Sequence, residues 1–185
     1  MTCIIEIGLP SWIINDGNFS DFKRGGHSRF AVQFYAPSPL DLIVGNQQSL
    51  LATIEKNRYR IVSKVSNAFA GWWTIEINGV HCFTQQTGPL GLQADCYVAG
   101  EVVLSVDPYF YKERLSRQIN APALAYNWKI RKIEIQTAPF VATGKGKARD
   151  PSQLGWREIN ETKANDNDGG FAEYVLHCER EEELS

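Results

Sequence analysis

The chain lacks a long hydrophobic run, a secretion signal and an excess of one charge. No apolar stretch approaches the roughly 20 residues of a membrane-spanning helix, so we expect no membrane contact. The first residues lack the basic segment and cleavage site of a signal peptide, and the four cysteines follow no known disulfide framework. These absences predict reduced thiols and a cytoplasmic location. The net charge of -2 gives no reason to expect nucleic acid or an anionic membrane as a partner.

Motifs for catalysis and cofactor binding are also missing. The Gly-x-Ser-x-Gly sequence of many serine hydrolases is absent. The segment Gly144–Arg149 is rich in glycine and lysine but lacks the Gly-x-x-x-x-Gly-Lys spacing of a phosphate-binding loop. Asp166 and Asp168 precede a glycine, but a calcium loop would need ligands where Ala164 and Val175 stand. The sequence therefore predicts no cofactor and no metal.

What the chain does contain is a series of short strand patterns separated by glycine, proline and asparagine. A length of 185 residues suits a single β-rich domain over 1–185. We expect an all-β fold, either an antiparallel barrel or a two-sheet sandwich, with one or two short helices. The expected strands are Thr2–Ile7, Phe19–Phe22, His27–Tyr35, Leu40–Val44, Arg58–Val65, Trp72–Ile77, Val80–Thr84, Leu92–Val106, Tyr126–Thr137 and Phe171–Cys178.

The remaining segments are assigned to helices, a loop and a tail. Asp107 is a natural N-cap, and Pro108 suits the first position of the helix that follows it. A second helix is expected over Gln47–Lys56 from the spacing of its apolar residues. Residues 142–161 read as a loop, and residues 179–185 read as a frayed acidic tail.

The dipeptide Asn78-Gly79 is the strongest local signal in the chain. It lies between two alternating runs, and Asn-Gly favours the type I′ turn of a two-residue hairpin. The register of that hairpin puts Glu76 opposite His81 and the apolar side chains on the other face. A second, symmetric turn would add a third strand ending at Val106 and complete a meander.

The same register argues against a zinc site. Four cysteines and three histidines could bind zinc, but each cysteine shares a face with apolar neighbours. We therefore expect Cys3, Cys82, Cys96 and Cys178 to be core thiols. The meander would bring Cys82 opposite Cys96, and a redox disulfide between them is an alternative to two packed thiols.

The outward face of the expected meander is the candidate ligand-binding surface. Aromatic rings on it could stack on a ligand, while its carboxylates and imidazole could form hydrogen bonds. A plain sheet surface with stabilising cross-strand pairs is the alternative interpretation. The candidate residues are Trp72, Glu76, His81, Phe83, Asp95 and Tyr97.

The leading functional hypothesis is a non-catalytic cytoplasmic binding or protein-interaction module, with an unknown protein or small molecule as partner. One alternative is an enzyme for small molecules or sugars in which Glu76 orients His81 for acid–base chemistry. A second alternative is a single-stranded nucleic-acid-binding OB-like barrel. That reading uses the basic and aromatic strand Tyr126–Lys132, and the overall charge weighs against it.

Overall fold

A computed structural model of the protein describes residues 4–144 and 146–181. These residues form thirteen strands, two short α-helices and three 3-10 turns. The strands are β1 (Ile4–Pro10), β2 (His27–Tyr35), β3 (Asp41–Ile43), β4 (Leu50–Glu55), β5 (Arg58–Phe69), β6 (Trp72–Ile77), β7 (Val80–Thr84), β8 (Tyr97–Val106), β9 (Ala125–Gln136), β10 (Phe140–Thr143), β11 (Gly146–Arg149), β12 (Trp156–Ile159) and β13 (Glu173–Arg180). The helical elements are α1 (Trp12–Asn15), α2 (Phe110–Glu113), η1 (Leu115–Arg117), η2 (Pro151–Gln153) and η3 (Asn167–Gly170).

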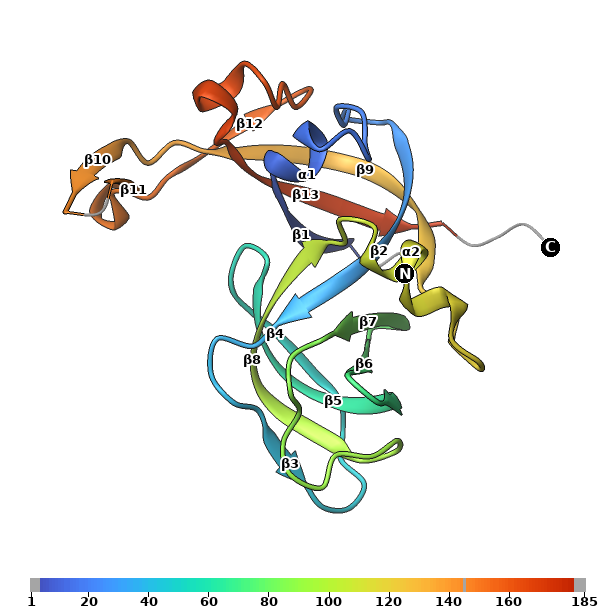
Figure 1. Ribbon diagram of the computed structural model, residues 1–185. Helices are drawn as coiled ribbons and strands as arrows, with labels where there is room; N and C mark the ends of the chain where they lie inside the picture. The colour runs from blue at the N-terminus through green and yellow to red at the C-terminus, as the bar shows by residue number, and fades with distance from the viewer. Residues whose placement is uncertain (1–3, 145, 182–185) are drawn as a thin grey trace.

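The main sheet closes into an eight-stranded β-barrel with extra strands. The circuit of paired strands runs β1–β13–β9–β2–β7–β6–β5–β8 and returns to β1 (Figure 1). The ends of β2 and β8 also pair with each other, from Val32–Val106 to Tyr35–Val103. Of the two expected architectures, the barrel is therefore the one that forms. The other strands of this main sheet are β3, β4 and β12, which lie on its edges outside the circuit.

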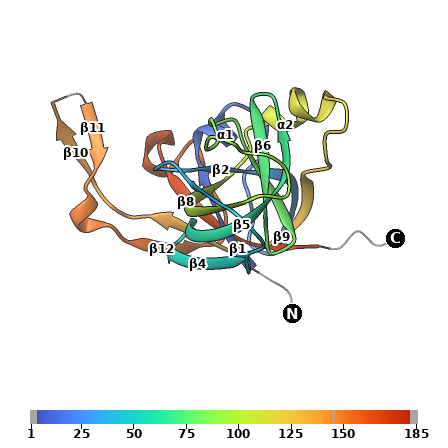
Figure 2. The same cartoon turned by 90° about the horizontal axis from the view of Figure 1, so that it is seen from below.

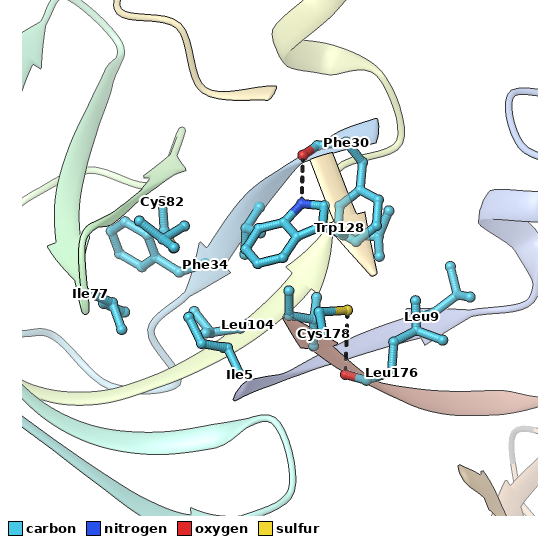
Figure 3. Packing of buried hydrophobic residues seen from close by; sticks show 14 of the residues in the cluster. Ile5, Leu9, Phe30, Phe34, Ile77, Cys82, Leu104, Trp128, Leu176 and Cys178 are labelled. Atoms are coloured by element: carbon cyan, nitrogen blue, oxygen red, sulfur yellow. Dashed lines mark hydrogen bonds between the residues drawn. The ribbon is translucent and has the colours of Figure 1, made fainter. Parts of the chain in front are cut away.

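The barrel encloses one continuous hydrophobic core. Its largest side chains include Trp128, whose indole nitrogen donates a hydrogen bond to the carbonyl oxygen of Phe30 at 3.0 Å (Figure 3). Val98, Val102, Leu104 and Val106 of β8 are fully buried, as the strand pattern predicts, whereas Gly100 is only half-buried. β9 contains a bulge at Arg131, because Lys132 pairs with His177 while Ile130 pairs with the next residue of β13.

The hairpin at Asn78-Gly79 has the predicted register. Both turn residues have positive φ, 48° and 77°, and Glu76 lies opposite His81. The predicted third strand of the meander is wrong. β8 pairs with β5, β2, β3 and β1, so Tyr97 lies opposite Lys64 rather than His81. The connection between β7 and β8 is long, so β8 can pair with strands elsewhere in the barrel instead of with β7.

The predicted helix over Gln47–Lys56 is also wrong, because this segment contains β4. Lys56 adopts φ of 49° and forms a two-residue turn that pairs Glu55 with Arg58, which draws the segment into a hairpin with β5. Three apolar residues at helical spacing could not outweigh this pairing. The helix after Asp107 exists, but it starts at Phe110. It is one turn long and is followed by the 3-10 helix η1.

The predicted loop over 142–161 contains ordered strands. β10 and β11 form a separate two-stranded ribbon that projects away from the barrel, and β12 joins the barrel edge beside β9 (Figures 1 and 2). The predicted tail begins too early, since β13 extends to Arg180, and residues 182–185 lie outside the described residues. Among the described residues, no helix is long and apolar enough to cross a membrane.

Candidate functional site

The predicted ligand-binding face is divided by the structure. Trp72 and Phe83 do point outward from the barrel, but they are only 1% exposed because α2 and η1 cover them. There they pack with Tyr111 and Leu115 in a second, smaller hydrophobic cluster. The indole nitrogen of Trp72 donates a hydrogen bond to the side-chain oxygen of Gln118 at 2.7 Å. These two aromatic rings hold the helical segment onto the barrel and have no free face for a ligand.

Glu76 and His81 lie opposite each other on β6 and β7, and neither belongs to the cluster that α2 and η1 cover. Ser66, the extra residue of a bulge in β5, lies with its hydroxyl 2.9 Å from His81 Nδ1. That hydroxyl also lies 2.7 Å from the hydroxyl of buried Thr74. The cavities lined by Phe19, by Trp12 and by Tyr35 do not include Glu76 or His81.

Asp95 and Tyr97 lie beside Lys64 of β5, away from the covered rings of Trp72 and Phe83. Asp95 is on the loop before β8 with φ of 68°, and its carboxylate is 2.6 Å from the ammonium group of Lys64. Tyr97 starts β8 and lies opposite Lys64 on one side and Ile43 on the other. Lys64 also interacts electrostatically with Glu76, so Glu76, Asp95 and Tyr97 meet around its ammonium group, whereas Trp72 and Phe83 are covered by the helical segment.

Cys82 and Cys178 lie in the core as side-chain parity predicts, but the expected position of Cys96 opposite Cys82 is wrong, because Cys82 pairs with Ile75 and Cys96 lies in the loop before β8. Cys82 and Cys178 are fully buried and Cys96 is half-buried, and all three are free thiols. Burial raises the pKa of the Cys82 thiol to about 12. Cys3 lies outside the described residues. No group of three or more histidine, cysteine, aspartate or glutamate side chains in 4–144 and 146–181 is arranged to hold a metal ion.

A cluster of ion pairs and hydrogen bonds surrounds Glu134 on the outer face of β9 and β13. Glu134 is 6% exposed and binds the ammonium group of Lys56 at 2.8 Å and the imidazole of His177 at 2.7 Å. Its other oxygen lies 3.1 Å from the ammonium group of Lys132. Lys56 comes from the β4–β5 turn, so the cluster links that hairpin to β9. We regard it as a structural tie.

The most promising site is a cavity of about 510 Å³ between the α2–η1 segment and the first half of β2. We call it the Tyr109 cleft. It lies on the side of the barrel opposite the projecting ribbon, where α2 approaches β2 (Figure 1). Its walls are mostly apolar and aromatic. The lining residues are Phe19, Arg29, Phe30, Ala31, Asp107, Tyr109, Tyr111, Lys112, Ser116, Ala123 and Ala125.

Tyr109 is the central side chain of this cleft. Its ring packs against Phe19 with centroids 4.8 Å apart, and the ammonium group of Lys112 lies 4.7 Å from its centroid. The backbone of Tyr109 is left-handed, with φ of 76°, a conformation that costs a non-glycine residue about 1 to 2 kcal/mol. Strained residues of this kind cluster at binding and catalytic sites, which makes this position a functional candidate.

Asp107 places a buried carboxyl group at the wall of the cleft. It is 3% exposed, and its two oxygens accept hydrogen bonds from the backbone N–H groups of Phe110 and Tyr111, both at 3.0 Å. Burial raises its pKa to about 6, and these hydrogen bonds only partly oppose the shift. A carboxyl group with a shifted pKa beside an apolar cavity is a recognised mark of a functional site.

A second cavity of about 430 Å³ adjoins the Tyr109 cleft and is more polar. The two share Phe19, Arg29 and Tyr109, so these residues form the wall between them. The second cavity also includes Lys23 and His27. Together the two cavities run along the first half of β2, beside the loop that precedes it.

Sequence reasoning did not find this site because its parts are distant in the chain. Phe19, Arg29 and Tyr109 come together only when β2 and the segment after β8 meet. Asp107 was assigned as a helix cap, which it is in part, and nothing local indicated that it would be buried beside a cavity. The one available signal was the aromatic run of Tyr109, Phe110 and Tyr111.

Comparison of this chain with protein-family models, with curated proteins and with solved structures gave no match.

Proposed function

We propose that this protein is a non-catalytic binding module whose small-molecule ligand occupies the Tyr109 cleft. The observation that carries the proposal is a preformed cavity of about 510 Å³ with an aromatic lining and a few polar groups. Ligand sites in proteins have volumes of about 300–1,000 Å³ and this same mixture of side chains. The free thiols of Cys82, Cys96 and Cys178 are consistent with a reducing, cytoplasmic location, which we include in the proposal.

Two other functions have less support from the geometry. Single-stranded nucleic acid would need exposed rings on β9, whereas Trp128 is fully buried and the Tyr126 hydroxyl accepts a hydrogen bond from the backbone of His81. An enzyme using Glu76 and His81 would need a concave site around the imidazole, and the cavities described above lie elsewhere.

The test is protein-observed NMR with small aromatic probes. Titration with indole, 2-naphthol and 1-anilinonaphthalene-8-sulfonate should shift the amide signals of Arg29–Ala31 and Tyr109–Lys112. Ala123 lines the cleft and is exposed, so Ala123→Trp should fill the cavity without disturbing the core and abolish these shifts. Ala148→Trp, on the projecting ribbon, is the matched control and should keep them. Shifts scattered over the barrel, or unchanged in Ala123→Trp, would refute the proposal.

A further inference from the structure

A cavity of about 500 Å³ lies at the C-terminal end of β2, between the loop that follows β2 and the loop that follows β7. We call it the Tyr35 cavity. It shares no lining residue with the Tyr109 cleft. We infer that the Tyr35 cavity is a second ligand site, which binds a small uncharged carbohydrate by stacking on Tyr35 and by hydrogen bonds from neighbouring amide and hydroxyl side chains.

The two loops that form the Tyr35 cavity are fastened to each other. The side chain of Gln86 accepts a hydrogen bond from the backbone N–H of Ala36 at 2.7 Å and donates one to the carbonyl oxygen of the same residue at 3.3 Å. The backbone of Gln86 is held as well, because its carbonyl oxygen accepts a hydrogen bond from the Trp73 indole at 2.9 Å and its N–H donates to the Thr84 hydroxyl at 3.1 Å. The cavity is therefore preformed, which lowers the entropy that a ligand loses on binding.

The lining of the Tyr35 cavity carries no charge among the described residues. The Tyr109 cleft differs in this respect, since Asp107 and Arg29 line it. An ionic ligand in the Tyr35 cavity would lose part of its hydration and meet no opposite charge, which is costly. The volume of about 500 Å³ lies within the range of about 300–1,000 Å³ for small-molecule sites, so the cavity suits an uncharged small molecule.

The polar side chains around this cavity are available to a ligand. Ser38, Gln85 and Thr87 line it and are exposed, and their side chains form no hydrogen bond with the part of the chain that the structure describes. An amide side chain both donates and accepts hydrogen bonds, and so does a hydroxyl group. The hydroxyl groups of a carbohydrate have the same double capacity, so each of these three side chains can bind one in either direction.

Tyr35 adds a flat apolar surface to these polar groups. Its side chain is 55% exposed, and no aromatic ring of the described residues packs against it. A pyranose ring presents C–H groups on one face and hydroxyl groups around its rim, which matches a ring beside polar side chains. A purely apolar ligand would displace water from Ser38, Gln85 and Thr87 without replacing its hydrogen bonds. The combination therefore favours a carbohydrate over an apolar molecule.

The experiment is an NMR titration with the methyl β-pyranosides of glucose, galactose and mannose, and with sorbitol as the comparison probe. Sorbitol carries similar hydroxyl groups but is acyclic and has no fixed C–H face. We expect at least one pyranoside to shift the amide signals of Ala36, Gln85 and Thr87 at millimolar concentration, and sorbitol to bind at least tenfold more weakly. Tyr35→Ala should abolish the pyranoside shifts, whereas Tyr35→Phe keeps the ring and should bind within about threefold of the wild-type protein.

The matched control is Phe171→Ala, which removes another exposed aromatic ring that lines a different cavity, and it should leave pyranoside binding unchanged. Gln85→Leu keeps the size of the side chain without its amide and should weaken binding at least threefold. No shift with any pyranoside, equal shifts with sorbitol, or shifts that survive Tyr35→Ala would each overturn the inference. None of these results would bear on the Tyr109 cleft, which the aromatic probes test separately.

Discussion

Replacing Asp107 with asparagine should change how the stability of this protein depends on pH. Burial raises the pKa of the Asp107 carboxyl group from its usual 3.8 to about 6 in the folded state. A shift of this size corresponds to about 3 kcal/mol of free energy between the two protonation states. Because the folded-state pKa is raised, the folded protein binds the proton more tightly than the unfolded chain does. The stabilising contribution is therefore complete below pH 3.8 and is lost as the pH rises to about 6.

In Asp107→Asn the side chain cannot ionise, so this contribution to the pH dependence disappears. We expect the unfolding free energy of the wild-type protein, relative to the variant, to fall by about 3 kcal/mol between pH 3.5 and pH 7. At pH 7 the variant avoids a buried charge but keeps only one acceptor oxygen for the N–H groups of Phe110 and Tyr111. Since a lost buried hydrogen bond costs about 1–3 kcal/mol, these two effects should nearly cancel at pH 7.

The assay is urea unfolding followed by tryptophan fluorescence at several pH values from 3.5 to 7. Asp150→Asn is the control, because hydrogen bonds from Ser152 lower the pKa of that exposed carboxylate. A lowered pKa has the opposite sign, so the wild-type protein should gain on this variant as the pH rises. A free-energy difference between wild type and Asp107→Asn that stays constant within about 0.5 kcal/mol would refute the account of Asp107 as a buried acid.

Three further predictions concern the charged cluster around Glu134, the ring of Phe83 and the thiols. Burial alone would raise the pKa of Glu134, but hydrogen bonds from Lys56, His177 and Lys132 lower it to about 2. Wild-type stability should therefore decline as the pH falls below about 4.5, and Glu134→Gln should lose about 3 kcal/mol in urea unfolding at pH 7. Phe83→Ala should lose about 3–5 kcal/mol and make the α2–η1 backbone amides exchange faster with deuterium, whereas unchanged exchange would show that this ring does not hold the segment. Iodoacetamide should label half-buried Cys96 in the native protein and leave Cys82 unlabelled until urea is added, as peptide mapping can check.

The features predicted correctly are those that depend on neighbouring residues. Asn78 and Gly79 both adopt positive φ, as their chemistry favours, so the turn and its register follow from six or eight residues of sequence. The burial of Cys82 follows from the same register, because alternate side chains of a strand lie on the same face. The prediction that Asp107 caps helical N–H groups is confirmed, although the helix starts at Phe110, two positions later than the pattern indicates.

The incorrect predictions concern segments that could pair with any of several strands. The segment from Leu50 to Glu55 has apolar residues at helical spacing, but pairing with β5 decided its structure. The strand ending at Val106 was assigned to the wrong neighbour, since the long loop before it carries no information on where the strand docks. The local sequence also gives no sign that the α2–η1 segment folds over the face that carries Trp72. That face is therefore predicted to be open, and the structure shows it covered.

The sequence by itself determined the β-rich class of this protein, the Asn78-Gly79 hairpin and the inward direction of Cys82 and Cys178. These are consequences of dihedral preference and strand alternation, which act within a few residues. Only the tertiary structure decided the closure of the barrel, the burial of Trp72 and the existence of the Tyr109 cleft. The cleft brings Arg29 and Tyr109 together from distant positions in the chain. Such a meeting depends on which strands pair and on which segment covers the remaining apolar surface, and both are settled by the free energy of the whole fold.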